Sequence, residues 1–481
     1  MNQGSTLKGK TIKSILWSGI EKFSSQGMQL IITFVLAMLL DPSEFGLIAV
    51  LVIIISISQT FIDSGFSNSL VQNNQRTEKD FSTAFYFNLL VALFIYIVLF
   101  FLAPVIAGLY DNEIYVSLIR ILGLNVVIFS LTLIQRAKLT IQLDFKSQAK
   151  ATIAAVIIGG AAGITSAVAG LGVWSLVIQQ LTANLTQCVF LWIISGWLPK
   201  ERFYAESFKK MFKYGSNLLA AGLLKTIYQD IYASIIGKQF TEADAGLFHQ
   251  GQKLAQFPST NLSSVMTRAV FPILSEMQDD KELLSKAFHK YIKLSFTIIA
   301  PLMLVLAALA GPVIYSLLPE RWNDSAIYLT ILSLAFVWYP VSGINSLIIY
   351  VTGQTKYSLI SEIWKKLFGF AILIVSLYFD LIIIASGLIL YNIIDMIISI
   401  IYAKKVIKTS ILKQIKMLAP MLCISIVTAL ITYYASNLFT GHWLQLIVGL
   451  LVAGVSLTAL LFIFQKKEMK EMLSMIKHLK F

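Results

Sequence analysis

Charged residues are scarce in this chain. Aspartate, glutamate, lysine and arginine make up 13% of its 481 residues, whereas a soluble domain carries about 25%. Hydrophobic residues make up 57%. So little polar side chain cannot cover a globule that faces water, and the composition therefore excludes an ordinary soluble protein.

Residues that build catalytic and metal sites are also few. The two cysteines, Cys188 and Cys423, lie inside apolar stretches and give no disulfide framework. The four histidines are scattered and have no metal-ligand spacing. The sequence has no Walker loop, so we expect no ATP hydrolysis by this chain. We therefore expect no catalytic residue, no metal and no cofactor.

Long apolar stretches dominate what is present. About fourteen of them follow one another along the chain, and most reach the roughly 20 residues that cross a bilayer as a helix. The sequence therefore predicts an all-α polytopic membrane protein with about fourteen transmembrane helices. The predicted stretches are 14–40, 45–71, 82–108, 115–137, 150–170, 173–197, 213–237, 243–272, 288–317, 325–352, 357–379, 382–403, 414–436 and 443–465.

The basic residues alternate between two sets of connecting segments. We assign 31 of the 38 lysines and arginines to the set that begins with the N-terminal tail, Lys365 and Lys366 among them. The other set holds only Lys238 and Arg321. This asymmetry follows the positive-inside rule, so both termini are predicted to be cytoplasmic. The formal charge of +13 then reflects the orientation of the chain in the membrane. The basic residues form no dense patch that would suggest a nucleic-acid partner.

The last residues, 466–481, form a basic segment with amphipathic spacing. We expect this tail to lie as a helix on anionic lipids of the inner leaflet, because an apolar stripe runs opposite its lysines. A solvated tail is the alternative. The stripe consists of Met469, Met472, Leu473, Ile476 and Leu479.

Some unusual residues inside the stretches have structural interpretations. Gly159 and Gly163 form a GxxxG pattern, which close helix packing explains better than a ligand. Glu362 and Asp395 fall in the eleventh and twelfth stretches, where we interpret each as a packing or pairing residue.

Two short segments of the chain match at an offset of 200 residues. Asp41-Pro-Ser-Glu-Phe-Gly-Leu-Ile48 corresponds to Thr241-Glu-Ala-Asp-Ala-Gly-Leu-Phe248, so that Gly46 aligns with Gly246 and Glu44 with Asp244. The matches fall at equivalent points of two blocks of six predicted helices. Since six is even, both blocks enter the membrane from the same side. This predicts a parallel repeat related by an axis along the membrane normal.

Three runs of sequence carry a family resemblance. They are Leu39-Leu-Asp-Pro-Ser-Glu-Phe-Gly-Leu-Ile-Ala-Val50, Phe61-Ile-Asp-Ser-Gly-Phe-Ser-Asn-Ser-Leu-Val-Gln72 and Phe271-Pro-Ile-Leu-Ser275. With these runs the chain resembles the Wzx-type polysaccharide and O-antigen flippases of the multidrug/oligosaccharidyl-lipid/polysaccharide superfamily. The resemblance covers essentially the whole chain, but its motifs say little about the substrate.

The resemblance implies both a fold and a function. The implied fold is a V-shaped pair of six-helix lobes around a central cavity, with two further helices at the C-terminus. The implied function is alternating-access transport of an undecaprenyl-pyrophosphate-linked oligosaccharide from the inner to the outer leaflet of the bacterial cytoplasmic membrane. A polysaccharide polymerase and chain-length machinery are the implied protein partners.

The repeat and the resemblance together predict a division of the chain. The N-terminal lobe is expected at 1–199 and the C-terminal lobe at 213–404, joined by a cytoplasmic linker at 200–212. The additional helices are expected at 405–465, followed by the tail.

Ionisable and amide side chains inside the predicted spans are the candidate site residues. They concentrate in the first two helices of each repeat, which line the cavity in the family, and an ionisable group inside a membrane is a functional candidate by default. Four basic residues are expected to attract a diphosphate, and four amides are expected to bond sugar hydroxyls. The basic residues are Lys22, Lys225, Lys253 and Arg268, and the amides are Gln26, Gln59, Asn68 and Gln256.

Three acidic residues have two open interpretations. Glu21, Asp63 and Asp230 either couple ions to transport or pair with neighbouring groups. Lys22 with Glu21, and Lys225 with Asp230, would be such pairs. The same alternative holds for the basic residues, because Arg268 near a helix end could also extend its charge to the membrane surface.

Two other functions compete with flipping. A drug or cation antiporter of the same superfamily would typically have twelve helices and an acidic cavity, whereas fourteen helices and basic residues favour an anionic lipid. A polysaccharide polymerase or ligase would need an outward catalytic loop, and the predicted outward loops are too short for one. We therefore expect a transporter and not an enzyme.

Overall fold

The computed structural model describes residues 24–63, 66–72, 75–142 and 144–465. Within these ranges every regular element is a helix. The prediction of an all-α protein is therefore confirmed for the described residues. The tail at 466–481, with its predicted amphipathic stripe, lies outside them.

Close contacts divide the chain into two compact units, 1–246 and 247–481. The predicted division into two six-helix lobes, at 1–199 and 213–404, stays a prediction. Unit 1 contains the helical segment Ser24–Leu39, α2 (Pro42–Asp63), α3 (Phe66–Gln72), α4 (Glu78–Leu109), α5 (Ile114–Leu122), α6 (Leu124–Ile141), α7 (Phe145–Val168), α8 (Trp174–Ser195), α9 (Ala205–Gln239) and the first turn of α10 (Glu242–Glu276).

Unit 2 contains the remainder of α10 and the helices that follow it. These are α11 (Lys281–Ala308), α12 (Ala310–Leu317), the 3-10 turn Glu320–Trp322, α13 (Ser325–Phe336), α14 (Tyr339–Val351), α15 (Thr355–Ser376), α16 (Leu381–Lys404), α17 (Ile411–Asn437) and α18 (His442–Phe464).

Ten helical segments in the described part of the chain are long and apolar enough to cross a membrane. Each of the four other predicted stretches is also helical. The described part of the first, Ser24–Leu39, is apolar but short, while α9, α10 and α15 carry charged and polar residues along their length. The chain is thus a polytopic helical membrane protein, and the count of fourteen spans stays a prediction.

The assignment of Lys365 and Lys366 to a connecting segment is wrong. Both lie in the middle of α15, and they are 2% and 9% exposed. The two sequence predictions disagreed with each other at this point, because the predicted apolar stretch 357–379 already contained both lysines; the structure agrees with the stretch and not with the charge assignment. The assignment of the other basic residues to the cytoplasmic set does not depend on these two lysines.

The two matched segments of the repeat form the same local structure. α2 begins at Pro42 after Asp41, whose backbone N–H donates to Glu44 Oε2 at 2.7 Å. α10 begins at the equivalent position after Thr241, whose N–H donates to Asp244 Oδ2 at 3.2 Å. In both, an acidic side chain three positions on accepts a hydrogen bond from the backbone N–H before the helix, as in a capping box, and Pro42 fits the first helical position. The predicted alignment of the two segments is confirmed for the helix starts and their capping hydrogen bonds.

The two helix starts also contact each other within unit 1. A Cβ atom added to Gly46 would overlap the Glu242 carbonyl group, and one added to Gly246 would overlap the Pro42 carbonyl oxygen. These contacts are reciprocal, since Pro42 and Glu242 are themselves equivalent in the repeat. Only glycine allows such an approach of two backbones. The alignment of Gly46 with Gly246 therefore marks a two-fold-like packing contact.

The GxxxG pattern packs α7 against α8, as predicted. A Cβ atom on Gly159 would lie 2.6 Å from Ala183 Cβ, and one on Gly163 would lie 2.6 Å from Gln179 Cβ. Small residues allow two helices to approach closely in a membrane, where van der Waals contact replaces the hydrophobic effect as the cause of packing. The turn that joins the helices contains Gly170 and Gly172, both with positive φ.

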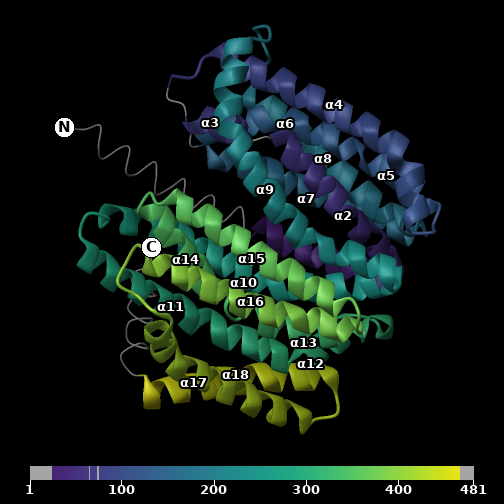
Figure 1. Cartoon of the computed structure of the whole chain (residues 1–481). Coiled ribbons are helices and arrows are strands. Elements are labelled where there is room, and N and C mark those ends of the chain that lie inside the picture. Colours follow the sequence, from purple (N-terminus) through teal and green to yellow (C-terminus); the bar gives the residue numbers. More distant parts are fainter. Residues whose placement is uncertain (1–23, 64–65, 73–74, 143, 466–481) are drawn as a thin grey trace. The chain divides into compact units, whose positions relative to one another are not determined.

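The last two helices pack on one side of unit 2 (Figure 1). α17 lies against α11, and α18 lies against α12, where Gly449 leaves room for Leu309. α17 buries a face of residues spaced three and four apart, including Leu418, Met421 and Ser425. This spacing places them in one stripe of a helix, so α17 is built to dock on unit 2.

Candidate functional site

Several of the predicted site residues lack a described side chain. Lys22 and Glu21 lie outside the described residues altogether. Asn68, Lys225 and Arg268 belong to α3, α9 and α10, but their side chains are not described. For these five residues the predicted roles stay predictions. The structure places side chains for Gln26, Gln59, Asp63, Asp230, Lys253 and Gln256.

Polar groups join α2 and α9 within unit 1. The Ser56 hydroxyl donates a hydrogen bond to the Asp230 carboxylate, and the hydroxyls of Thr60 and Thr226 lie 3.1 Å apart. Gly222 lies one helical turn before Thr226, where an added Cβ would be 3.2 Å from Thr60 Cγ2. Ser56 and Thr60 of α2 therefore pack on α9. Asp230 thus has a hydrogen-bond partner in Ser56, while its predicted pairing with Lys225 stays a prediction.

Two other predicted residues hold buried oxygen atoms without a partner among the described residues. These atoms are Oε1 of Gln26 and Oδ1 of Asp63. Most buried polar atoms have a hydrogen-bond partner, and an exception indicates a water, an ion or a ligand. Gln59, on the same helix as Asp63, is half-buried. All three remain candidates for contact with a polar substrate or a bound water.

One face of α10 packs against α13 within unit 2. Phe248 contacts the Tyr328 ring edge to face at 6.0 Å between centroids, and Ser259 Oγ donates to the Phe336 carbonyl oxygen at 3.0 Å. Gly251 lies between them, where an added Cβ would be 2.9 Å from the Leu329 backbone nitrogen. This face is therefore fully used in packing.

The polar residues of α10 lie on a different face from the one that packs against α13. His249, Lys253 and Gln256 recur at spacings of four and three residues, so they share a face. At about 100° per residue, this face lies about 120° around the helix from the face that packs on α13. All three side chains are half-buried. α10 thus carries a basic and amide stripe that its packing on α13 does not need.

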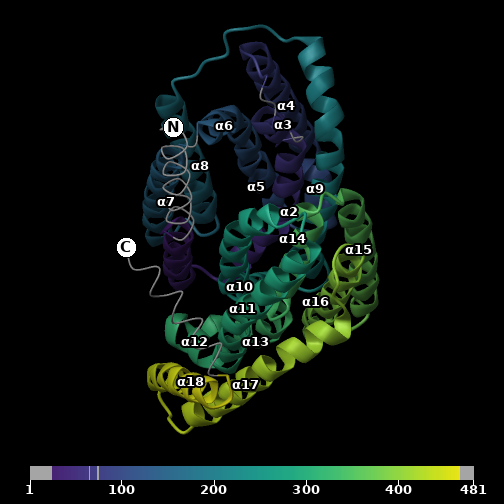
Figure 2. The same cartoon turned by 90° about the vertical axis from the view of Figure 1, so that its left-hand side faces the viewer.

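A charged cluster that the sequence interpretation missed lies on α15 and α16, which run side by side in unit 2 (Figure 2). Lys365 Nζ is 2.9 Å from Glu362 Oε1 and 3.3 Å from Asp395 Oδ1. The Lys365 side chain is only 3% exposed. The interpretation of Glu362 and Asp395 as pairing residues is confirmed, and their shared partner is a lysine that had been assigned to a loop.

The neighbouring lysine extends this cluster. Lys366 Nζ donates to the Tyr391 hydroxyl at 2.9 Å and lies 3.9 Å from Glu362 Oε2. The spacing of Glu362, Lys365 and Lys366, at three and four residues within an apolar stretch, was the available sequence signal. Asp395 could not be added to it from spacing, because it comes from another helix.

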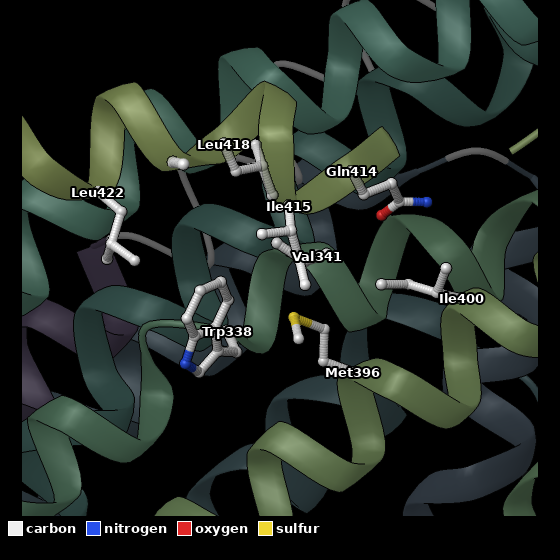
Figure 3. Close-up of a pocket in the computed structure, with 9 residues that line it drawn as sticks. Trp338, Val341, Met396, Ile400, Gln414, Ile415, Leu418 and Leu422 are labelled. Atoms are coloured by element: carbon white, nitrogen blue, oxygen red, sulfur yellow. The ribbon is translucent and has the colours of Figure 1, made fainter. Parts of the chain in front are cut away.

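A small apolar pocket lies between α14, α16 and α17 (Figure 3). Trp338, Met396 and Leu418 are among the residues that line it. Its polar lining residue, Gln414, exchanges two hydrogen bonds of 2.9 Å with the Asn345 amide. Since that amide is engaged, the pocket is suited to an apolar group and not to a sugar or a diphosphate.

The described residues form no group of three or more His, Cys, Asp or Glu side chains that could hold a metal ion. The groups available for chemistry are ammonium, carboxylate, amide and hydroxyl groups on long polar helices. Such groups bind and release charged or hydroxylated molecules by hydrogen bonds and charge. These groups are suited to binding a polar molecule.

Comparisons with known proteins agree with this picture. The family model described as "Polysaccharide biosynthesis protein" matches residues 35–327. The lipopolysaccharide biosynthesis protein WzxC of Escherichia coli K12 is 24% identical over 66% of this chain and 65% of its own length. The succinoglycan biosynthesis transport protein ExoT of Rhizobium meliloti is 23% identical over 71% of this chain and 67% of its own length. The match to WzxC thus spans slightly less than two thirds of that relative.

A solved structure shares the fold. The lipid II flippase MurJ, in an inward closed conformation, aligns over 93% of this chain and 99% of its own length, with a TM-score of 0.76 and 15% identity. The family model covers more than half of the chain, and the fold agrees with it. The chain therefore belongs to the polysaccharide biosynthesis protein family, and it shares the fold of the MurJ structure.

Proposed function

We propose that this protein is a flippase for a lipid-linked oligosaccharide. Its substrate is an undecaprenyl-pyrophosphate-linked glycan, which it moves from the inner to the outer leaflet of a bacterial cytoplasmic membrane for export of a surface polysaccharide. The observation that carries the proposal is the polar character of α10, a helix of 35 residues within a polysaccharide biosynthesis family. A helix of that length can cross a bilayer, and polar groups along it need a polar occupant.

The side chains on α10 suit the two polar parts of this substrate. Lys253 supplies positive charge for the diphosphate, and Gln256 supplies an amide for sugar hydroxyls. Coulomb attraction strengthens where water is scarce, so one or two such lysines contribute substantially to binding. Translocation also requires release, which favours several moderate contacts over one strong site. Gln26, Gln59, Asn68, Lys22, Lys225 and Arg268 are the other proposed contacts.

The transport cycle is proposed to be alternating access. Two lobes at 1–199 and 213–404 would open alternately to either side of the membrane, with both termini in the cytoplasm. Anionic lipids would contact the basic tail at 466–481. A polysaccharide polymerase and its chain-length partners would receive the translocated glycan outside. The enzyme alternative, a polymerase or ligase, is set aside because the relative ExoT is a transport protein by name.

Deletion of the gene in its bacterial host tests the function in the cell. We expect loss of a surface polysaccharide and accumulation of its lipid-linked repeat unit, with both effects reversed by the gene on a plasmid. Drug sensitivity should not change. An intact surface polysaccharide together with increased drug sensitivity would instead identify an antiporter of the same superfamily.

A further inference from the structure

The charged cluster on α15 and α16 lies deep within its helices. Lys365 is ten residues from the first residue of α15 and eleven from the last, which places it about 15 Å from either end. In a hydrocarbon core of about 30 Å this is close to mid-depth. Ionisable residues at that depth are costly and mark pathways of ions or substrates. The proposed contacts for the glycan do not use this cluster.

The formal charges of the cluster balance. Two carboxylates, of Glu362 and Asp395, face two ammonium groups, of Lys365 and Lys366. The other polar or titratable groups that face them are Ser346 and Tyr339 of α14 and Tyr391 of α16. In this balanced state a single added proton changes the net charge of the cluster from zero to plus one.

Glu362 is the acid of the cluster that a proton can reach. Its side chain is 40% exposed, compared with 16% for Asp395. At about 100° per residue it lies about 150° around α15 from the centre of the exposed apolar face, so it does not belong to that face. That face consists of Leu359, Ile363, Trp364, Leu367 and Phe368.

We propose that Glu362, held by Lys365 and Lys366 beside Asp395, is a proton-binding site that is loaded and emptied during transport. The proton adds to a carboxylate oxygen of Glu362, and no other bond changes. Because Lys365 Nζ already stands between the two carboxylates, the exchangeable cation is a proton and not a metal ion. With Glu362 neutral, the two ammonium groups face one carboxylate, and the excess positive charge favours an anionic substrate. By linkage, the substrate then favours the proton equally.

Proton binding can be measured on the full-length protein in lipid without any substrate. Infrared difference spectra between two pH values should contain the carboxyl band of protonated Glu362. We expect Glu362→Gln to lose this band, while the control Glu282→Gln retains it. Glu282 also pairs with a lysine four residues on, at 2.8 Å, but both side chains are largely exposed. Identical spectra for the wild type and Glu362→Gln would overturn the proposal.

A second variant keeps the test decisive if Glu362→Gln folds poorly. Lys365→Met removes the ammonium group that stabilises ionised Glu362, so the carboxyl band should appear at a pH higher by about one unit or more. An unchanged midpoint would overturn the proposal.

The coupling to transport rests on the proposed function and has its own readout. Translocation of the lipid-linked glycan by wild-type proteoliposomes should depend on pH, and that dependence should be absent in Glu362→Gln. Retention of the wild-type dependence would overturn the coupling. If the wild type moves no glycan at all, the proposed function fails, while the infrared titration still decides whether Glu362 binds a proton.

Discussion

Replacing Lys253 by alanine is expected to reduce polysaccharide export strongly while leaving the protein folded in the membrane. Lys253 is half-buried on the face of α10 that does not pack on α13, so its loss should not disturb that contact. A hydrogen bond to a charged group contributes about 1.5–3 kcal/mol, and 1.4 kcal/mol is a factor of about ten. Export should fall by about tenfold or more. Surface polysaccharide per cell, at matched protein levels, measures the effect.

Two comparisons separate this effect from a general loss of charge. Lys286→Ala removes a lysine that is 73% exposed on α11, and it should leave export unchanged. Lys253→Arg keeps the charge and should retain part of the activity. We expect Lys225→Ala to behave as Lys253→Ala does. Normal export by both Lys225→Ala and Lys253→Ala would show that the cationic binding of the diphosphate is wrong.

Adding a single methyl group at the contact of the two helix starts is expected to be strongly destabilising. In Gly46→Ala the new Cβ would overlap the Glu242 carbonyl group, and in Gly246→Ala it would overlap the Pro42 carbonyl oxygen. Backbone atoms cannot turn aside as a flexible side chain can, so α2 and α10 must separate. Overpacking typically costs about 1–3 kcal/mol. Thermal unfolding of the purified variants in detergent should therefore begin at a clearly lower temperature, and less protein should accumulate in the membrane.

The matched control is Gly454→Ala in α18. In the described part of the chain no heavy atom outside the glycine's own surroundings lies within 4 Å of a Cβ added there, and alanine is the better helix former. This variant should be as stable as the wild type or slightly more stable. If Gly46→Ala and Gly454→Ala unfold at the same temperature, the backbone contact does not exist in the folded protein.

Local features of the fold were predictable from the sequence because each depends on a pattern within a short segment. A GxxxG pattern specifies a smooth helix face, so Gly159 and Gly163 indicated the packing of α7 before any neighbour was known. The match of Asp41–Ile48 with Thr241–Phe248 likewise predicted two equivalent helix starts. What it could not predict is that Gly46 and Gly246 touch, since that depends on how the helices are packed.

The site was less predictable, because burial and pairing join residues far apart in the sequence. Lys365 was assigned to a connecting segment although it falls within the predicted stretch 357–379, since a lysine usually lies in water. Its actual position becomes favourable only with Glu362 on one side and Asp395, from another helix, on the other. Ser56 and Thr60 of α2 are a similar case, because their contacts with Asp230 and Thr226 of α9 join helices far apart in the sequence.

Reconstituted translocation tests the central claim most directly. The purified protein would be placed in liposomes together with a polyprenyl-diphosphate-linked oligosaccharide, and the glycan that becomes accessible to an added glycosidase would be followed over time. The account predicts that wild-type liposomes expose a pool of glycan that empty liposomes keep protected, and that Lys253→Ala liposomes do not. Wild-type liposomes that behave as empty ones, with the protein folded, would contradict it.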